Sequence, residues 1–254
     1  MKLGRTRPDY SVVHPQFAVA VPDGATLPAA CNYGPKGQPA LSNVYLNDQL
    51  GDCVIAGGYH VLATATGNAG NLFTATDDQI TKDYTAIGGY VPGDPNTDQG
   101  CDEVTALNFW QKTGFADKSK ITSWAYIDPT NVAHVKAALY YLENLYLGVE
   151  LPDAWVNPMP SEDGFVWGVA GDPVPENGHC IIAVGYNADG VIVDTWGLLG
   201  IVTWAALAKY FSADANGNCF VILTPDQLVK ASAKAPNGLN WTALEREIWS
   251  IHAR

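Results

Sequence analysis

The sequence predicts an α+β fold in which a mainly helical half precedes a mainly β half. Residues 53–66 (CVIAGGYHVLATAT) are apolar on almost every face, which is typical of a buried helix. Apolar positions recur at helical spacing in residues 131–145, which predicts a second helix. Residues 179–197 contain two β-rich runs around Asn187–Gly190, a turn sequence with Gly where a positive φ is tolerated.

Shorter elements are predicted between and after these segments. The further helices are expected at residues 77–84, 101–112 and 204–210, and the further strands at 146–151 and 219–224. Residues 153–178 form a long, proline-rich loop directly before His179. Long loops in compact domains often carry functional residues.

Changes in composition predict three regions. Residues 1–46 are rich in Pro, Gly and Asn, so we expect an extended arm with turns, without a helix or a regular sheet, that wraps over a domain. Residues 47–230 contain the predicted helices and strands and form the main domain. Residues 231–254 include an amphipathic segment, WTALEREIWSIHA, which predicts a C-terminal helical extension.

The composition of the 254 residues excludes several classes of partner. The net charge of −12 gives no electrostatic support for binding nucleic acid or an anionic membrane. No apolar run approaches a membrane span, and the first residues lack a signal-peptide core, so we expect a cytoplasmic protein, or one released or carried in a virion by another route. The five cysteines form no CxxC pair, which argues against zinc, and their odd number favours reduced thiols.

The candidate chemistry lies in Cys53, His179 and Asp194. Cys53 follows a Gly-Asp turn and opens the buried helix, where the helix dipole and unpaired N–H groups favour a thiolate. His179 begins the first strand of the hairpin and Asp194 lies on the second, so antiparallel pairing is expected to bring them together. Asp194 would then fix the imidazole tautomer and hold His179 toward Cys53. Each residue alone also fits a structural role, and their combination is what predicts a catalytic triad.

These motifs resemble the papain family of cysteine peptidases. Gly51-Asp52-Cys53 opens a buried helix, and GHCIIAVGYNADGVIVDTWG follows far downstream. In that family the catalytic His precedes a strand ending in Ala-Val-Gly-Tyr, and the next strand carries Asn-Ser-Trp-Gly. The resemblance implies a papain-like fold and a triad of Cys53, His179 and Asp194, with Trp196 packed against the last two. Asp194 stands at the position of the family's Asn. In this respect the sequence resembles the bacteriocin-processing peptidase domains of ABC transporters, where Asp-Cys also forms the nucleophile turn.

The resemblance also indicates where an oxyanion would be bound. The family has a Gln six residues before the nucleophile, whereas this sequence has Asn47 at that distance and Gln49 at four. Either amide could act beside the backbone N–H of Cys53, and the spacing favours Asn47. The implied reaction is hydrolysis of a peptide or amide bond by a thiolate–imidazolium pair through an acyl-enzyme. It requires no metal or cofactor, and its partner is a peptide or protein substrate.

Other interpretations stay open at this level. The same fold could serve a non-catalytic binding or structural protein, such as a virion component, or an acyl transferase or cell-wall amidase. The acidic segment Asp94–Glu103 is similar to a calcium loop but lacks Gly and Glu in the required register, so a loop before a helix is predicted. His60 lies about two helical turns from Cys53 and is not expected to be the base.

Overall fold

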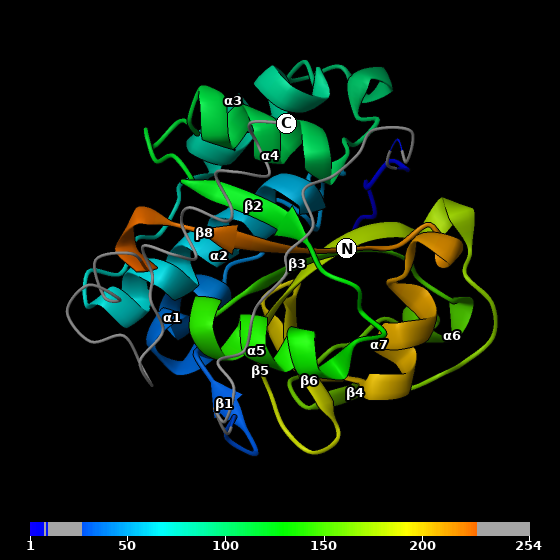
Figure 1. Cartoon of the computed structure of the whole chain (residues 1–254). Coiled ribbons are helices and arrows are strands. Elements are labelled where there is room, and N and C mark those ends of the chain that lie inside the picture. The colour runs from blue at the N-terminus through cyan, green and yellow to red at the C-terminus, as the bar shows by residue number, and fades with distance from the viewer. Residues whose placement is uncertain (8, 10–26, 228–254) are drawn as a thin grey trace.

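The computed structural model describes residues 1–7, 9 and 27–227, and these form the predicted α+β fold (Figure 1). The helices are α1 (Gly34–Leu41), α2 (Cys53–Ala69), α3 (Asp77–Gly88), α4 (Glu103–Lys112), α5 (Val132–Leu142), α6 (Asp153–Val156) and α7 (Trp204–Tyr210). The strands are β1 (Cys31–Asn32), β2 (Ser123–Tyr126), β3 (Leu145–Glu150), β4 (Phe165–Trp167), β5 (Gly178–Tyr186), β6 (Gly190–Thr195), β7 (Leu198–Thr203) and β8 (Asn218–Leu223). Short 3-10 turns lie at Pro95–Thr97, Pro175–Asn177 and Ala213–Ala215.

The strands form one sheet in the order β2-β8-β3-β5-β6-β7-β4, with β1 added to β5. Its pairs are antiparallel except for β4 with β7. Helices α2, α3 and α4 lie on one side of the sheet, and α5 and α7 lie on the other (Figure 1). The sheet therefore separates two hydrophobic cores, and alternate residues of each strand contribute to one core or the other.

The two faces of β5 show this alternation. Ile181 and Ala183 belong to the core beside α5 and α7, whereas Cys180, Ile182 and Val184 belong to the core beside α2. Helix α2 packs closely on the second face because it has a glycine there: a Cβ on Gly57 would lie 3.1 Å from the Tyr146 ring. This close packing fixes the first turn of α2, and with it Cys53, relative to the sheet.

The sequence predicted the long elements and missed several short ones. The helices expected at 53–66, 77–84, 101–112, 131–145 and 204–210, and the strands expected at 146–151, 179–197 and 219–224, all correspond to elements of the structure. The strands β1, β2, β4 and β7 and the short helix α6 were not predicted, and because α6 and β4 lie within residues 153–178, the expectation of one long loop there was wrong. The expectation of neither a helix nor a regular sheet in residues 1–46 was wrong, because α1 lies there and β1 pairs with β5. The predicted C-terminal helix falls outside the described residues. None of the described helices is long and apolar enough to cross a bilayer.

The first residues of the chain lie on the main domain as an extended segment, residues 1–7, which we call the strap. Its backbone is hydrogen-bonded at both ends of its path: Lys2 N donates to Asn47 O at 2.7 Å, and Thr6 N donates to Cys101 O at 3.1 Å. Between them, Gly4 N and Arg5 N both donate to Gly178 O at 3.1 Å. The strap is thus held directly beside the first residue of β5, where His179 follows.

Candidate active site

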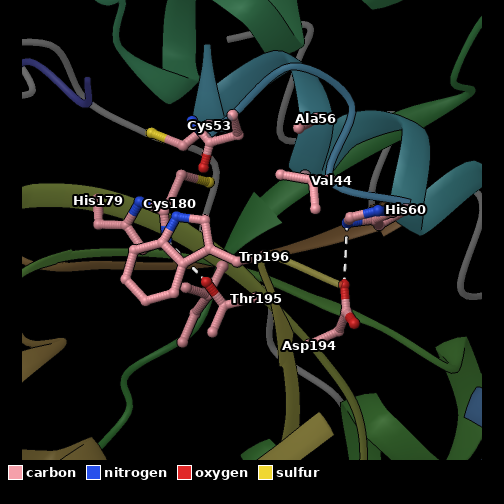
Figure 2. A pocket seen from close by; sticks show the side chains of 12 residues that line it. Val44, Cys53, Ala56, His60, His179, Cys180, Asp194, Thr195 and Trp196 are labelled. Carbon is pink, nitrogen blue, oxygen red and sulfur yellow. Dashed lines mark hydrogen bonds and ion pairs between the residues drawn. The ribbon is translucent and has the colours of Figure 1, made fainter. Parts of the chain in front are cut away.

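Cys53 is the first residue of α2 and is buried. The preceding turn is fixed by the Asp52 carbonyl, which accepts from Ile55 N and Ala56 N, and by Gly51 N, which donates to the Asp98 carboxylate at 2.8 Å. Cys53 lines one small pocket together with His179, as predicted from the sequence (Figure 2). The pocket also contains Asn47, His60, Asp194, Thr195 and Trp196.

His179 is held from two sides, by the last residue of β6 and by the residue that follows it. Its Nε2 lies 2.8 Å from Thr195 Oγ1, and the Trp196 ring stacks on the imidazole at 4.4 Å between centroids. Trp196 and Gly197 have φ angles of 51° and 76°, so the chain turns sharply there and the indole lies over His179. The expected packing of Trp196 against His179 is therefore present.

The predicted contact between His179 and Asp194 is not formed. Asp194 Oδ2 lies 2.9 Å from His60 Nδ1, on the side of the pocket away from His179 (Figure 2). Thr195, which the sequence analysis did not single out, takes the expected position beside His179. The only sequence signal for Thr195 was its place within the same Asp-Thr-Trp-Gly motif.

A β-bulge explains the exchange of Asp194 for Thr195. Tyr186 pairs with Val191, and an unbroken hairpin would continue from there to place Asp194 opposite Ala183, on the face of His179. The register shifts between Ala183 and Gly185, so that Asp194 instead pairs with Ile182. A shift of one residue moves a side chain to the other face of a sheet. Asp194 therefore faces α2, and Thr195 faces His179.

The His60–Asp194 pair is buried and fully engaged on the histidine side. His60 Nε2 lies 2.9 Å from the carbonyl oxygen of Asn43, so this nitrogen must carry a hydrogen and donate. The other ring nitrogen, Nδ1, lies within ion-pair distance of Asp194 Oδ2, at 2.9 Å. Burial raises the pKa of Asp194, and the neighbouring His60 opposes this shift. With both ring nitrogens occupied, His60 is unsuited to act as a base, in line with the sequence analysis.

In contrast, one nitrogen of His179 is available. His179 Nδ1 is buried and has no hydrogen-bond partner among the described residues. If Nε2 carries the hydrogen and donates it to Thr195, Nδ1 presents a lone pair. A buried nitrogen without a partner costs stability and calls for an explanation. A role in accepting a proton supplies one.

Burial dominates the electrostatics of the site, and the strap adds smaller contributions through Gly4 and Arg5. Hydrogen bonds from the backbone of Cys180 and Gly4 reach the Cys53 thiol, but desolvation dominates and raises its pKa to about 12. Burial, and then the positive charge of Arg5, lower the pKa of His179 to about 3. The expected resting thiolate–imidazolium pair is therefore wrong for the strap-covered form, which holds a neutral thiol and a neutral imidazole.

The two candidate oxyanion donors differ in position. Asn47 is buried and lines the pocket, and its amide donates to Leu50 O at 3.0 Å and to Asp52 Oδ1 at 3.1 Å. Gln49 is exposed and does not line the pocket. Which of the two stabilises an oxyanion stays a prediction: Asn47 lines the pocket, but both hydrogens of its amide are already donated, so it would have to exchange one of these bonds.

Comparisons with known proteins identify the fold. No family model matches the sequence, and no curated protein sequence matches it. Among solved structures, the chain is similar to xylellain, a cysteine protease from Xylella fastidiosa, with a TM-score of 0.65 and 15% identity over 87% of this chain and 96% of that one. It is also similar to a digestive procathepsin L 3 of Tenebrio molitor (TM-score 0.58, 10% identity, 87% and 75% covered). A Carica candamarcensis cysteine protease gives a TM-score of 0.53 at 14% identity, with 78% and 99% covered.

The chain therefore has the papain-like fold of cysteine proteases. At these identities the similarity extends to the fold alone. The chemistry must be argued from the side chains of this protein.

Proposed function

We propose that this protein is a thiol hydrolase that cleaves peptide or amide bonds, with Cys53 as nucleophile and His179 as base. The observation that carries the proposal is that His179, with its unpartnered nitrogen, and the helix-start thiol of Cys53 line one pocket. An extended peptide segment, the strap, contacts Asn47 and Cys53 of that lining. A nucleophile, a base and a track for a peptide backbone are the parts that acyl transfer from a peptide requires.

The reaction would begin when His179 Nδ1 accepts the Cys53 proton. The sulfur attacks the carbonyl carbon, and the oxygen of the tetrahedral intermediate is stabilised by the backbone N–H of Cys53 and by a side-chain amide. Asn47 is the candidate amide that lines the pocket, and it would exchange its bond to Leu50 O or Asp52 Oδ1 for one to the oxyanion. The imidazolium then protonates the leaving amine, and the carbon–nitrogen bond breaks to leave a thioester. Water, deprotonated by His179, releases the acid and restores the thiol.

Thr195 and Trp196 would serve as positioning residues in this scheme. The hydrogen bond between His179 Nε2 and Thr195 Oγ1 keeps Nδ1 free, and the stacked indole restricts rotation of the ring. A neutral hydroxyl stabilises an imidazolium less than a carboxylate does. The site therefore resembles an Asn-containing triad more closely than the predicted Asp-containing one.

Hydrolysis requires the strap to move, because the Gly4 backbone contacts the Cys53 thiol. Two of the strap's ion pairs, Lys2 with Asp98 and Arg7 with Glu150, join a half-exposed basic side chain to a buried carboxylate. Removing the two basic side chains weakens the hold on the strap and keeps the fully buried Arg5–Glu103 pair. We call the double variant Lys2→Ala/Arg7→Ala the loosened protein. It should be more active than the wild type.

The test is cleavage of a mixed peptide library by the loosened protein, followed by mass spectrometry. Adding Cys53→Ala should abolish cleavage, whereas the matched change Cys31→Ala, at a half-buried thiol outside the pocket, should preserve it. Undiminished cleavage by the Cys53→Ala protein would remove this residue as the nucleophile.

The covered, neutral thiol favours a second function, peptide binding without hydrolysis. In that case the loosened protein would bind peptides and leave them intact. Alkylation of Cys53 by iodoacetamide separates the two functions further, since a hydrolase site should become more reactive once the strap is loosened.

A further inference from the structure

The strap binds a groove that is built for a peptide backbone rather than for this one segment alone. Cys101 N donates to Gly4 O at 3.0 Å, and Thr6 N donates to Cys101 O, so the strap and Cys101 are joined like neighbouring strands. Main-chain bonds of this kind accept many side-chain sequences.

Glycines line the groove where the strap passes. A Cβ on Gly100 would lie 1.7 Å from Gly4 O, and one on Gly178 would lie 2.2 Å from Arg5 O. A Cβ on Gly51 would meet Gly4 Cα at 3.1 Å. The walls therefore lack side chains where an extended chain must approach, which leaves room for a peptide backbone directly over Cys53.

The charged side chains of the groove favour a basic peptide. Each basic residue of the strap meets a carboxylate of the main domain: Lys2 with Asp98 at 2.6 Å, Arg5 with Glu103 at 2.5 Å, and Arg7 with Glu150 at 2.6 Å. The three carboxylates have side-chain exposures of 4%, 0% and 2%. Carboxylates are rarely buried unless they are paired, so these three favour a basic occupant.

The pocket that holds Arg5 is the most specific part of the groove. The Arg5 side chain is fully buried, and Gly148 forms one wall, where a Cβ would lie 1.8 Å from Glu103 Oε1 and 2.3 Å from Arg5 Nε. In the amide orientation that satisfies both of its polar atoms, Asn218 accepts from Arg5 Nη2 at 3.1 Å. A planar guanidinium can bond to Glu103 and Asn218 together, whereas a lysine ammonium offers a single point of charge.

We infer that this groove is a binding site for extended basic peptides, and that the pocket formed by Glu103, Gly148 and Asn218 selects an arginine side chain. The strap is the occupant in this structure, and an arginine-containing segment of another peptide takes its place when it leaves. That such peptides are substrates rests on the proposed hydrolase function, whereas their binding does not.

Binding to the full chain carrying Arg5→Ala and Cys53→Ala tests this inference without hydrolysis. The probes are a fluorescent peptide with the sequence of residues 1–7 and its matched form with citrulline, a neutral isostere, in place of the fifth residue. We expect the arginine peptide to bind at least about tenfold more tightly in fluorescence anisotropy, as for one charge-assisted hydrogen bond. Adding Glu103→Gln to the protein should remove the preference.

Equal binding of the two peptides, no binding of either, or a preference that survives Glu103→Gln would overturn the inference. Because Arg5→Ala empties a buried site and could prevent folding, the same titrations are repeated on the loosened protein with Cys53→Ala, which retains the Arg5–Glu103 pair. There the arginine peptide must displace the strap, and the citrulline peptide should do so poorly. Cleavage of the arginine peptide by the loosened protein with Cys53 intact then tests the hydrolase separately, because binding without cleavage contradicts only the proposed function.

Discussion

The two histidines of the pocket have opposite environments although their partners are consecutive residues of one strand. His179 contacts a hydroxyl through Nε2 and leaves Nδ1 unbonded among the described residues, whereas His60 contacts a carbonyl and a carboxylate through its two nitrogens. The comparison indicates that a histidine suited to proton transfer is distinguished by a free nitrogen, and not by an adjacent carboxylate. His60 with Asp194 instead joins α2 to β6.

The largest expected difference between the two histidines is in activity. In the loosened protein, His179→Ala should lower kcat/KM by about 10³-fold or more, because it removes the base. The matched change His134→Ala, on α5, should have little effect. Peptide cleavage with circular dichroism as a folding control measures this, and an active His179→Ala protein would show that His179 is not the base.

For His60 the expected loss is in stability. His60→Ala should lower the free energy of unfolding by about 3–5 kcal/mol, because it leaves Asp194 buried without its partner. Denaturant unfolding of His60→Ala, Asp194→Ala and the double variant measures the coupling. If the two losses simply add, the pair does not hold α2 to β6.

The candidate oxyanion donors provide a third test. Asn47→Ala should lower kcat by about 10²-fold, the usual cost of one oxyanion donor. Gln49→Ala is the matched control, and it should leave kcat close to that of the loosened protein because its side chain is exposed. A larger effect at Gln49 would reverse the assignment.

Thr195 should have a smaller effect than either His179 or Asn47. Thr195→Val keeps the shape and removes the hydrogen bond to His179, so kcat should fall by about tenfold with little change in KM. Thr195→Ser retains the hydroxyl and should recover most of the activity, which a purely structural role for the methyl group would not allow.

The last test concerns how the stability of the fold depends on pH. Burial raises the pKa of Asp52 from 3.8 to about 8, so the folded protein binds more protons there than the unfolded chain between these values. This residue's contribution is fully present below pH 3.8 and is lost as the pH rises toward 8. Thermal unfolding of Asp52→Asn from pH 4 to 9 should show a weaker decline than the wild type, and parallel curves would contradict the shift.

Patterns within one element could be predicted from the sequence, and relations between elements could not. Helix α2, the hairpin and α7 have strong periodicity or turn signals, so they were found. The helix α1 was missed because its residues GPKGQPAL have poor helix propensity, and its packing against α2 compensates for this.

In the candidate site, too, features within one element were predicted and relations between elements were not. Cys53 and His179 were predicted from the ends of their elements, and the pocket brings both together. The exchange of Asp194 for Thr195 depends on the bulge between Ala183 and Gly185, and no residue of the hairpin predicts this bulge. The position of the strap depends on contacts between residues almost a hundred or more positions apart, such as Arg5 with Glu103, which a local pattern cannot contain.

The hydrogen bonds of the strap have a consequence for how the site opens. Asn47 O, Gly178 O and both backbone groups of Cys101 are bonded to the strap, so its departure leaves these four main-chain groups to be solvated or paired again. An incoming peptide that lies along the same path restores these bonds as the strap gives them up. Opening is then an exchange of one extended segment for another. By mass action, the peptide concentration sets the fraction of molecules in which a peptide, and not the strap, lies beside Cys53.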